Sequence, residues 1–203
     1  MRLARPPEWG PLQCMHGSWH RIDAVVRLLK EHMPEDFAFV EVGVLFGDMP
    51  VHVLPLFPGM TYVGVDPWWA NPGWGNMQRT RQHELDAARL AAEARMWRFE
   101  GRARLLQKKS VDAAQEFADG SLDVVFIDAD HRYEQVLADV LAWLPKVREG
   151  GLLCGHDYCA DDDKNNWPGV LAGVYEGLKR HAQAVTSDWP HTTVWSTVIK
   201  REG

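Results

Sequence analysis

This sequence has few cysteines, no long hydrophobic run and no excess of basic residues. Cys14, Cys154 and Cys159 form no CxxC pair, and such an odd set is typical of reduced thiols in a cytoplasmic protein. No apolar run approaches the roughly 20 residues that cross a bilayer, and no apolar core follows the N-terminal arginines. The formal net charge of −6 disfavours a nucleic-acid partner. We therefore expect a cytoplasmic protein with no signal peptide and no membrane or nucleic-acid partner.

Strand-like and helix-like segments alternate along the chain, which we interpret as a single domain over residues 1–203. The expected strands are residues 37–44, 61–66, 103–107, 122–128 and 151–157, with two more in 184–200. The expected helices are residues 18–33, 78–99, 110–117, 133–147 and 168–182. This alternation predicts an α/β fold, a doubly wound parallel sheet with helices on both faces. The closing hairpin should add an antiparallel strand at or near one edge.

A glycine turn follows the first expected strand in the segment EVGVLFGD, residues 41–48. Gly43 and Gly47 suit a tight strand-to-helix turn where backbone approaches a ligand. Asp66 ends the next strand, where an acid commonly binds ribose hydroxyls. Leu45 stands where a nicotinamide fingerprint requires its second glycine. A nucleoside without pyrophosphate, such as S-adenosylmethionine (SAM), therefore fits better, with Glu41 toward its cationic end.

Two later strands end in acidic residues and histidines. Asp128, Asp130 and His131 follow one strand, and His156 and Asp157 follow the next. Ligands of open α/β sheets bind at these carboxyl ends. Three close carboxylates repel one another, and a divalent cation relieves that repulsion. In the alternative interpretation the acids only cap the following helix, with Asp130 as its N-cap; His131 then either touches substrate or lies on an exposed loop.

These blocks together resemble the class I SAM-dependent methyltransferases, in particular a small bacterial family with an IDxDH…GG…HDY pattern, over roughly residues 38–160. The resemblance implies a Rossmann-like seven-stranded sheet of order 3-2-1-4-5-7-6. It assigns the cofactor site to Glu41, Gly43, Gly47, Asp66, Ser110 and Asp128, with Asp66 on the ribose and Ser110 near the adenine. Ser110 should also cap the helix that begins there.

The acidic strand ends are similar to those of metal-dependent O-methyltransferases of sugars and catechols. This likeness implies that Asp128 and Asp157 hold a divalent metal, Mg or Mn, and that Asp130 is the base. His156 departs from the pattern, since many relatives carry an acid there. His156 is therefore either a ligand of a softer metal or the general base itself.

A tryptophan-rich segment follows Asp66 directly. Trp68 and Trp69 lie among prolines and glycines that oppose regular structure, so we expect residues 67–78 to form a lid that contacts substrate. In the alternative interpretation the tryptophans fill a core or a contact within a homodimer. Tyr158 is a further expected substrate contact. Residues 1–37 read as an N-terminal helical extension.

From these features we expect a SAM-dependent O-methyltransferase assisted by a divalent metal. We expect its acceptor to be a hydroxyl of a small molecule, a saccharide or glycosylated metabolite. Four alternatives stay open: a metal-independent methyltransferase with His156 as base, a nicotinamide-dependent oxidoreductase, a non-catalytic SAM-binding subunit, and a nucleic-acid methyltransferase, which no basic stripe supports. Leu45 disfavours the oxidoreductase, and the acid cluster disfavours the non-catalytic subunit.

Overall fold

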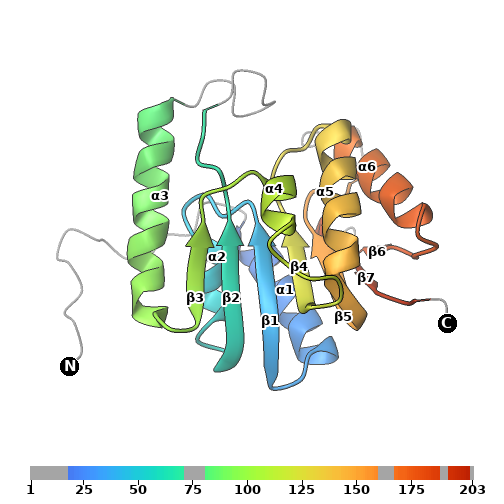
Figure 1. The fold of residues 1–203 in the computed structure, drawn as a ribbon, viewed down its shortest axis with the longest axis horizontal. Helices are drawn as coiled ribbons and strands as arrows, with labels where there is room; N and C mark the ends of the chain where they lie inside the picture. Colours follow the sequence, from blue (N-terminus) through green and yellow to red (C-terminus); the bar gives the residue numbers. More distant parts are fainter. Residues whose placement is uncertain (1–17, 71–80, 160–166, 188–191, 202–203) are drawn as a thin grey trace.

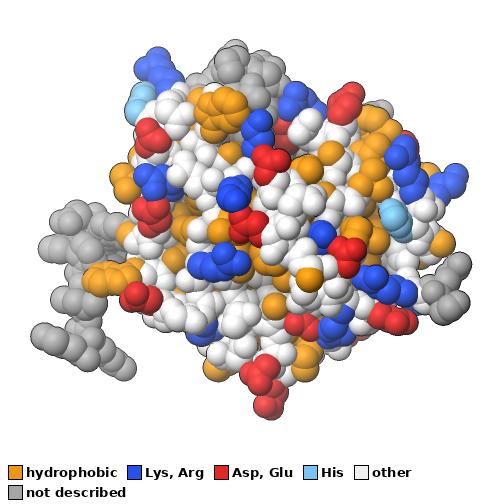
Figure 2. Space-filling view, in the orientation of Figure 1, with side chains coloured by type: hydrophobic (Ala, Val, Ile, Leu, Met, Phe, Trp, Pro, Cys, Tyr) orange, Lys and Arg blue, Asp and Glu red, His pale blue; other side chains and the backbone are white. Residues whose placement is uncertain are grey.

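The structure is a computed structural model, and it describes residues 18–70, 81–159, 167–187 and 192–201. Within these ranges no helix is long and apolar enough to cross a bilayer. On the face drawn in Figure 2, acidic and basic side chains are interspersed. Of the expected lid, residues 71–78 lie outside the described ranges.

The described chain alternates strands and helices as expected, with small shifts at the ends. The strands are β1 Asp36–Val42, β2 Gly59–Val65, β3 Ala103–Leu106, β4 Leu122–Ile127, β5 Val147–Gly155, β6 Thr186–Ser187 and β7 Trp195–Val198. The helices are α1 Ser18–His32, α2 Asp48–Val53, α3 Gln82–Met96, α4 Ser110–Ala114, α5 Tyr133–Trp143 and α6 Pro168–Lys179, with short 3-10 turns η2 Trp97–Phe99 and η3 Leu144–Lys146. Helix α2, between β1 and β2, is an element that the sequence analysis did not identify.

All seven strands form one sheet of order β3-β2-β1-β4-β5-β7-β6, which confirms the expected topology. Strands β1 to β5 pair in parallel. Strand β7 pairs antiparallel with both β5 and β6, so the closing hairpin completes one edge. The arrowheads of the parallel strands in Figure 1 mark a single edge of the sheet, where their carboxyl ends meet.

Helices cover both faces of the sheet, and each face has its own apolar core. Residues of α4, α5 and α6, among them Trp143 and Val174, pack on one face. Residues of α1, α2 and the end of α3, among them Leu29 and Met49, pack on the other. In Figure 1, α4 and α5 lie in front of the sheet and α1 and α2 lie behind it. A smaller cluster joins α3 to the loops after β1 and β2.

Helix α1 contributes to the carboxyl edge although it precedes the sheet in sequence. Its last residue, His32, lies four residues before β1, so α1 runs opposite to β1 and presents its first turns at the edge where the parallel strands end. Ile22, Val25 and Leu29 anchor its buried side. This packing brings Arg21, beside Ile22, toward the ends of β1 and β4.

Candidate active site

The turn after β1 is built on two glycines with left-handed backbone. Gly43 has φ +94°, and a Cβ added there would lie 2.0 Å from the backbone oxygen of Asp128. Gly47 has φ +73° and precedes α2, with Ala92 of α3 at 3.3 Å from such a Cβ. Leu45 between them also has a positive φ of 47°. The glycines thus let this loop pack against the loop after β4 and against α3.

Asp66, at the end of β2, fastens the same turn. Its Oδ2 accepts hydrogen bonds from the backbone N–H groups of Val44 and Leu45, both 3.0 Å, and its Oδ1 accepts one from Trp68, 2.8 Å. Burial raises the pKa of Asp66, and these three hydrogen bonds only partly offset it. A carboxylate offers about four acceptor sites, so one remains for a ligand hydroxyl.

A pocket of about 410 Å³ opens beside Asp66, beyond the ends of β2 and β3. It is lined by Pro67, Trp68, Trp69, Gln82, Gln107, Lys108 and Lys109. The Trp69 ring is half exposed, and Lys109 Nζ lies 5.0 Å from its centroid. A flat ring next to a carboxylate that can accept a hydroxyl hydrogen bond is a combination that suits a nucleoside, so the residues fit a nucleoside cofactor here.

Trp68 differs from its neighbour Trp69 because it belongs to the core. Only 1% of Trp68 is exposed, and it packs with Leu85 and Ala92 of α3. Its indole Nε1 donates a 2.8 Å hydrogen bond to the backbone oxygen of Leu45. For Trp68, therefore, the structure places the side chain under the turn after β1 rather than on an open substrate surface.

Ser110 is not the helix cap that the sequence suggested. The residue before α4 in the cap position is Lys109, and no side chain caps this helix. The Ser110 hydroxyl instead accepts a 2.9 Å hydrogen bond from Trp143 Nε1 and bonds the buried Asp139. Its contacts therefore fasten α4 to α5, one residue away from the pocket.

Glu41 is buried near the end of β1, on the face covered by α1. Tyr62 of β2 donates a short hydrogen bond to Glu41 Oε2. Burial raises the pKa of Glu41 to about 8, although the Tyr62 hydrogen bond and the charge of Arg21 lower it. At neutral pH this carboxyl is therefore mostly protonated, and it lies beneath the site rather than in open contact with a ligand.

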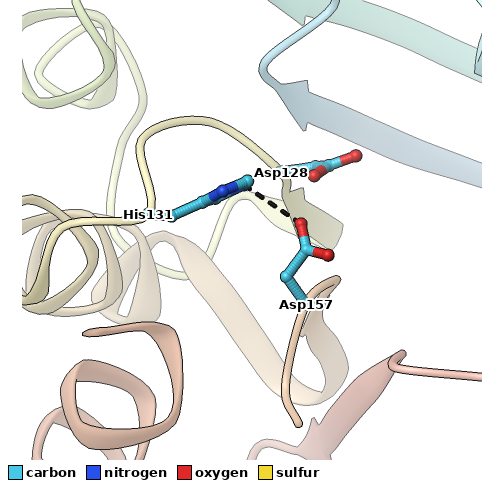
Figure 3. A group of neighbouring side chains, drawn as sticks. All are labelled: Asp128, His131 and Asp157. Atoms are coloured by element: carbon cyan, nitrogen blue, oxygen red, sulfur yellow. Dashed lines mark ion pairs between the residues drawn. The ribbon is translucent and has the colours of Figure 1, made fainter. Parts of the chain in front are cut away.

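The loops after β4 and β5 bring together Asp128, His131 and Asp157, which we call the acid–histidine cluster (Figure 3). One potential ligand atom from each lies within 4.8 Å of the others. His131 Nε2 is 3.0 Å from Asp157 Oδ2. Asp157 has a left-handed φ of +60°, and its carboxylate lies in this group. His131, doubtful from sequence, is thus a central member.

His156 lies beside this cluster rather than replacing His131 in it. Its Nδ1 is 3.1 Å from Asp157 Oδ1 and 4.0 Å from Asp128 Oδ1. Its Nε2 is 3.0 Å from the hydroxyl of Thr193, just before β7. Both ring nitrogens of His156 therefore have protein partners.

The two histidines change the protonation of their shared acid. Burial would raise the pKa of Asp157, but its hydrogen bonds with His131 and His156 dominate and hold that pKa well below its usual range. Burial lowers the pKa of His131, and the neighbouring carboxylates, Asp157 first, outweigh burial and raise it. Asp157 is therefore a stable anion that orients both imidazoles.

Asp130 points away from the cluster. Its carboxylate accepts hydrogen bonds from the backbone N–H of Arg132, 2.9 Å, and from the Arg132 guanidinium, 2.7 Å at Nη2. The N-cap residue of α5 is Arg132, so Asp130 does not occupy the cap position expected from sequence. Asp130 instead stabilises the turn before α5.

Arg21 is a site residue that the sequence analysis missed. From α1 it donates a short hydrogen bond to Asp128 Oδ2, and Asp128 in turn raises the pKa of the Arg21 guanidinium. A long separation along the chain hid this contact, which joins residues 107 positions apart. One feature of the sequence could have pointed to Arg21: it lies in the first turns of the helix that precedes β1.

The donor set of the cluster suits a divalent cation, but Arg21 already neutralises the charge of Asp128. Carboxylate oxygens with an imidazole are a usual set for Mn²⁺. Yet Arg21 occupies Asp128 Oδ2, and His131 and His156 face the two oxygens of Asp157. A metal at this cluster would have to bind Asp128 through Oδ1 while the guanidinium stays on Oδ2, with two positive charges on one carboxylate, so the residues as placed do not fit an added ion.

Tyr158 and Trp167 close the far side of the cluster. The ring of Trp167, at the start of α6, lies 4.6 Å from that of His131, centroid to centroid. Tyr158 donates its backbone N–H to Thr193 O at 2.9 Å and packs against the core beneath α5 and α6. Of these two aromatic residues, Trp167 is the one that contacts His131.

Comparison with known proteins identifies the family. The family model described as a methyltransferase domain matches residues 40–158, more than half of the chain. An uncharacterized protein of Sinorhizobium fredii, y4gI, is 34% identical over 55 residues, which are 27% of this chain and 6% of that protein. The chain thus covers only a small part of this curated relative.

Solved structures share the fold at low sequence identity. A Corynebacterium glutamicum protein has a TM-score of 0.65 and 16% identity, with 91% of this chain and 82% of that one covered. CalS11, a TDP-rhamnose 3′-O-methyltransferase of calicheamicin biosynthesis, has a TM-score of 0.56 and 17% identity, covering 88% and 76%. Spermidine synthase of Thermotoga maritima has a TM-score of 0.58 and 15% identity, covering 88% and 57%.

The family match spans the glycine turn, Asp66 and the acid–histidine cluster in one continuous segment. The sheet order is the one that the sequence resemblance implied. The chain therefore belongs to the methyltransferase domain family, with the class I methyltransferase fold.

Proposed function

We propose that this protein is a SAM-dependent O-methyltransferase that acts on a hydroxyl group of a small molecule. The observation that carries the proposal is the adjacency of two sites at one sheet edge. The nucleoside-type site at Asp66 and Trp69 is joined through the Gly43 turn to the acid–histidine cluster. A cofactor held along this turn would place its reactive end toward Asp128.

Each part of the cofactor site has a stated task in this proposal. When bound, SAM supplies an electrophilic methyl group on its sulfonium. Asp66 accepts a hydrogen bond from a ribose hydroxyl at its remaining acceptor site, and the Trp69 face stacks on the adenine. Gly43 carries no side chain, so the turn packs directly against the backbone of Asp128 and keeps the cofactor site next to the acid–histidine cluster.

His131 is the general base that the geometry supports best. Its Nε2 faces Asp157, which fixes the tautomer with the proton on Nε2, and within the described residues Nδ1 makes no hydrogen bond. Nδ1 can therefore accept the proton of the acceptor hydroxyl while the oxygen attacks the methyl carbon and the carbon–sulfur bond breaks. His156, one of the two bases that the sequence suggested, has both ring nitrogens engaged. Asp130 is held by Arg132.

A saccharide or glycosylated metabolite is the acceptor class we favour. Two features support it: the aromatic surface of Trp167 beside His131, on which a sugar ring can stack, and the likeness in fold to CalS11, whose name records a sugar nucleotide. The spermidine synthase neighbour has the same fold, so the fold by itself does not identify the acceptor.

Metal-assisted transfer is the second candidate. It is favoured by the close approach of the ligand atoms of Asp128, His131 and Asp157. In that form Mg²⁺ or Mn²⁺ would bind at the cluster. We place it second because Arg21 already pairs with Asp128.

The test of the function is a binding and transfer experiment. Calorimetry with SAM should give a 1:1 complex, and mass spectrometry of pooled glycosides with SAM and enzyme should detect products one methyl group heavier. Tight binding of a nicotinamide dinucleotide with no binding of SAM would contradict the proposal. Binding of SAM without transfer to any hydroxyl in a broad pool would favour a non-catalytic SAM-binding protein.

A further inference from the structure

Arg21 lies near several carboxyl groups and pairs directly with one of them. The attractions that raise its pKa come, in falling order, from Asp128, Glu41, Asp157 and Asp48. Its direct partner is Asp128. The Arg21 side chain is mostly buried, so these attractions are screened less than they would be at the surface.

The buried Nε of Arg21 indicates that charge, rather than full hydrogen bonding, holds this side chain in place. Among the described residues Nε has no hydrogen-bond partner, although it is shielded from solvent. An unsatisfied buried donor is unfavourable, so a compensating attraction must keep the guanidinium there. The ion pair with Asp128 supplies that attraction, because the guanidinium stays charged at all physiological pH values.

We propose that Arg21 is a built-in cation that takes the place of a divalent metal beside Asp128, so that the acid–histidine cluster works without a metal ion. The inference rests on the proposed function for its catalytic meaning. Arg21 is a positioning residue in this scheme: it fixes Asp128 and balances its charge, and it takes no proton from the acceptor.

The physical reason is that one anionic site cannot easily hold two cations in contact. A metal bound to Asp128, His131 and Asp157 would lie within a few ångströms of the guanidinium, and like charges at that distance repel strongly in a partly buried site. The first turns of α1 add to this exclusion, since the N-terminal end of a helix carries a partial positive charge. Arg21 lies in this part of α1.

The test measures binding of Mn²⁺ to the purified full-length protein by electron paramagnetic resonance and calorimetry, without turnover. The variants are Arg21→Met, which removes the charge at similar length, and Arg21→Gln, which keeps a polar end. Arg89→Met is the matched control, because Arg89 pairs with Glu93 on α3, away from the cluster. Circular dichroism verifies folding, and SAM titration of the same samples tests the proposed function separately.

We expect no specific Mn²⁺ binding by the wild-type protein or by Arg89→Met. Arg21→Met and Arg21→Gln should bind Mn²⁺ at least about tenfold more tightly, because they remove a positive charge at contact distance and free the Asp128 carboxylate. Adding Asp128→Asn to Arg21→Met should abolish the gain.

Two results would overturn the inference. One is specific Mn²⁺ binding by the wild-type protein, if the Asp128→Asn variant loses that binding. This result can be obtained even if both Arg21 variants fail to fold. The other is a folded Arg21 variant with no gain in Mn²⁺ affinity. If SAM fails to bind while the Mn²⁺ results are as expected, the proposed function is wrong, but the inference that Arg21 replaces a metal beside Asp128 is supported.

Discussion

Gly43 lies directly against the backbone of Asp128. A Cβ on Gly43 would come within 2.0 Å of the Asp128 carbonyl oxygen and 2.6 Å of its carbonyl carbon. Because these atoms are backbone, neither can rotate away. The contact locks the turn after β1 to the loop that carries the acid–histidine cluster.

Gly43→Ala should therefore destabilise the protein by about 3 kcal/mol or more. The left-handed φ of +94° contributes part of this cost and the backbone clash the rest. Gly101→Ala is the matched control, since Gly101 has φ +92° and nothing within 4 Å of an added Cβ. Its loss should be limited to about 1–2 kcal/mol. Urea unfolding measures the free energy of unfolding of both variants. Equal losses of stability would show that the contact between Gly43 and Asp128 adds no cost.

Asp66→Ala should weaken SAM binding by roughly 1–3 kcal/mol, because it removes charge-assisted hydrogen bonds to the ribose and to the turn. Isothermal calorimetry gives the affinity. Asp36→Ala, at the opposite end of β1, serves as control. A SAM affinity unaffected by Asp66→Ala would exclude this carboxylate from the cofactor site.

Trp69→Ala should also lower SAM affinity, by about 1–3 kcal/mol if the ring stacks on the adenine. Trp97→Ala is its control, because Trp97 is similarly exposed, in η2 at the end of α3. Fluorescence or calorimetric titration with SAM separates the two variants. If Trp69→Ala weakens binding of the acceptor and leaves SAM affinity unchanged, the Trp69 ring belongs to the acceptor site.

Glu41 should make stability fall as pH rises. The folded-state pKa of about 8 lies above the ordinary value of 4.5, so between these values the folded chain keeps a proton that the unfolded chain has lost. Stability is therefore lost between about pH 4.5 and 8, by roughly 2–5 kcal/mol, and is level above that range.

Glu41→Gln should abolish that slope, since the amide cannot ionise and can still accept the Tyr62 hydrogen bond. The variant should match the wild type near pH 4.5 and exceed it above pH 8. Glu31→Gln, on the exposed side of α1, is the control. Urea unfolding at a series of pH values measures the effect, and parallel curves for the wild type and Glu41→Gln would contradict it.

His131→Asn should slow methyl transfer by about 10²–10⁴-fold, the usual contribution of a general base, while SAM affinity stays nearly unchanged. Single-turnover mass spectrometry with an identified acceptor measures the rate. His181→Asn, at the exposed end of α6, is the control. If Asp130→Asn slows methyl transfer by a comparable factor and His131→Asn does not, Asp130 is the general base.

The fold and the positions of the acids were predictable because they depend on local pattern. Strand periodicity and the glycine turn place Asp66, Asp128 and Asp157 at strand ends, and the observed sheet order confirms that framework. Asp130 shows the limit of this reasoning, since its partner is Arg132, two residues away, rather than the cluster.

The remaining site residues depend on tertiary packing, which sequence spacing does not encode. Arg21 comes from a helix that could have lain on several faces, and only its packing on β1 brings it to Asp128. From the sequence His156 was a candidate base and His131 only a possible substrate contact. Thr193, far along the chain from β5, contacts Nε2 of His156. That contact leaves His131, rather than His156, with a ring nitrogen that can bind the acceptor hydroxyl.

The Arg21–Asp128 pair also has a consequence for biosynthesis. The two residues are separated by 107 positions, and Asp157 comes later still. At roughly 5–20 residues per second of translation, about 5–20 s pass between synthesis of Arg21 in α1 and synthesis of its partner Asp128. During that time the buried side of α1, with Val25 and Leu29, lacks its complete sheet. The nascent N-terminal half is thus a candidate client for chaperones that bind exposed apolar helices.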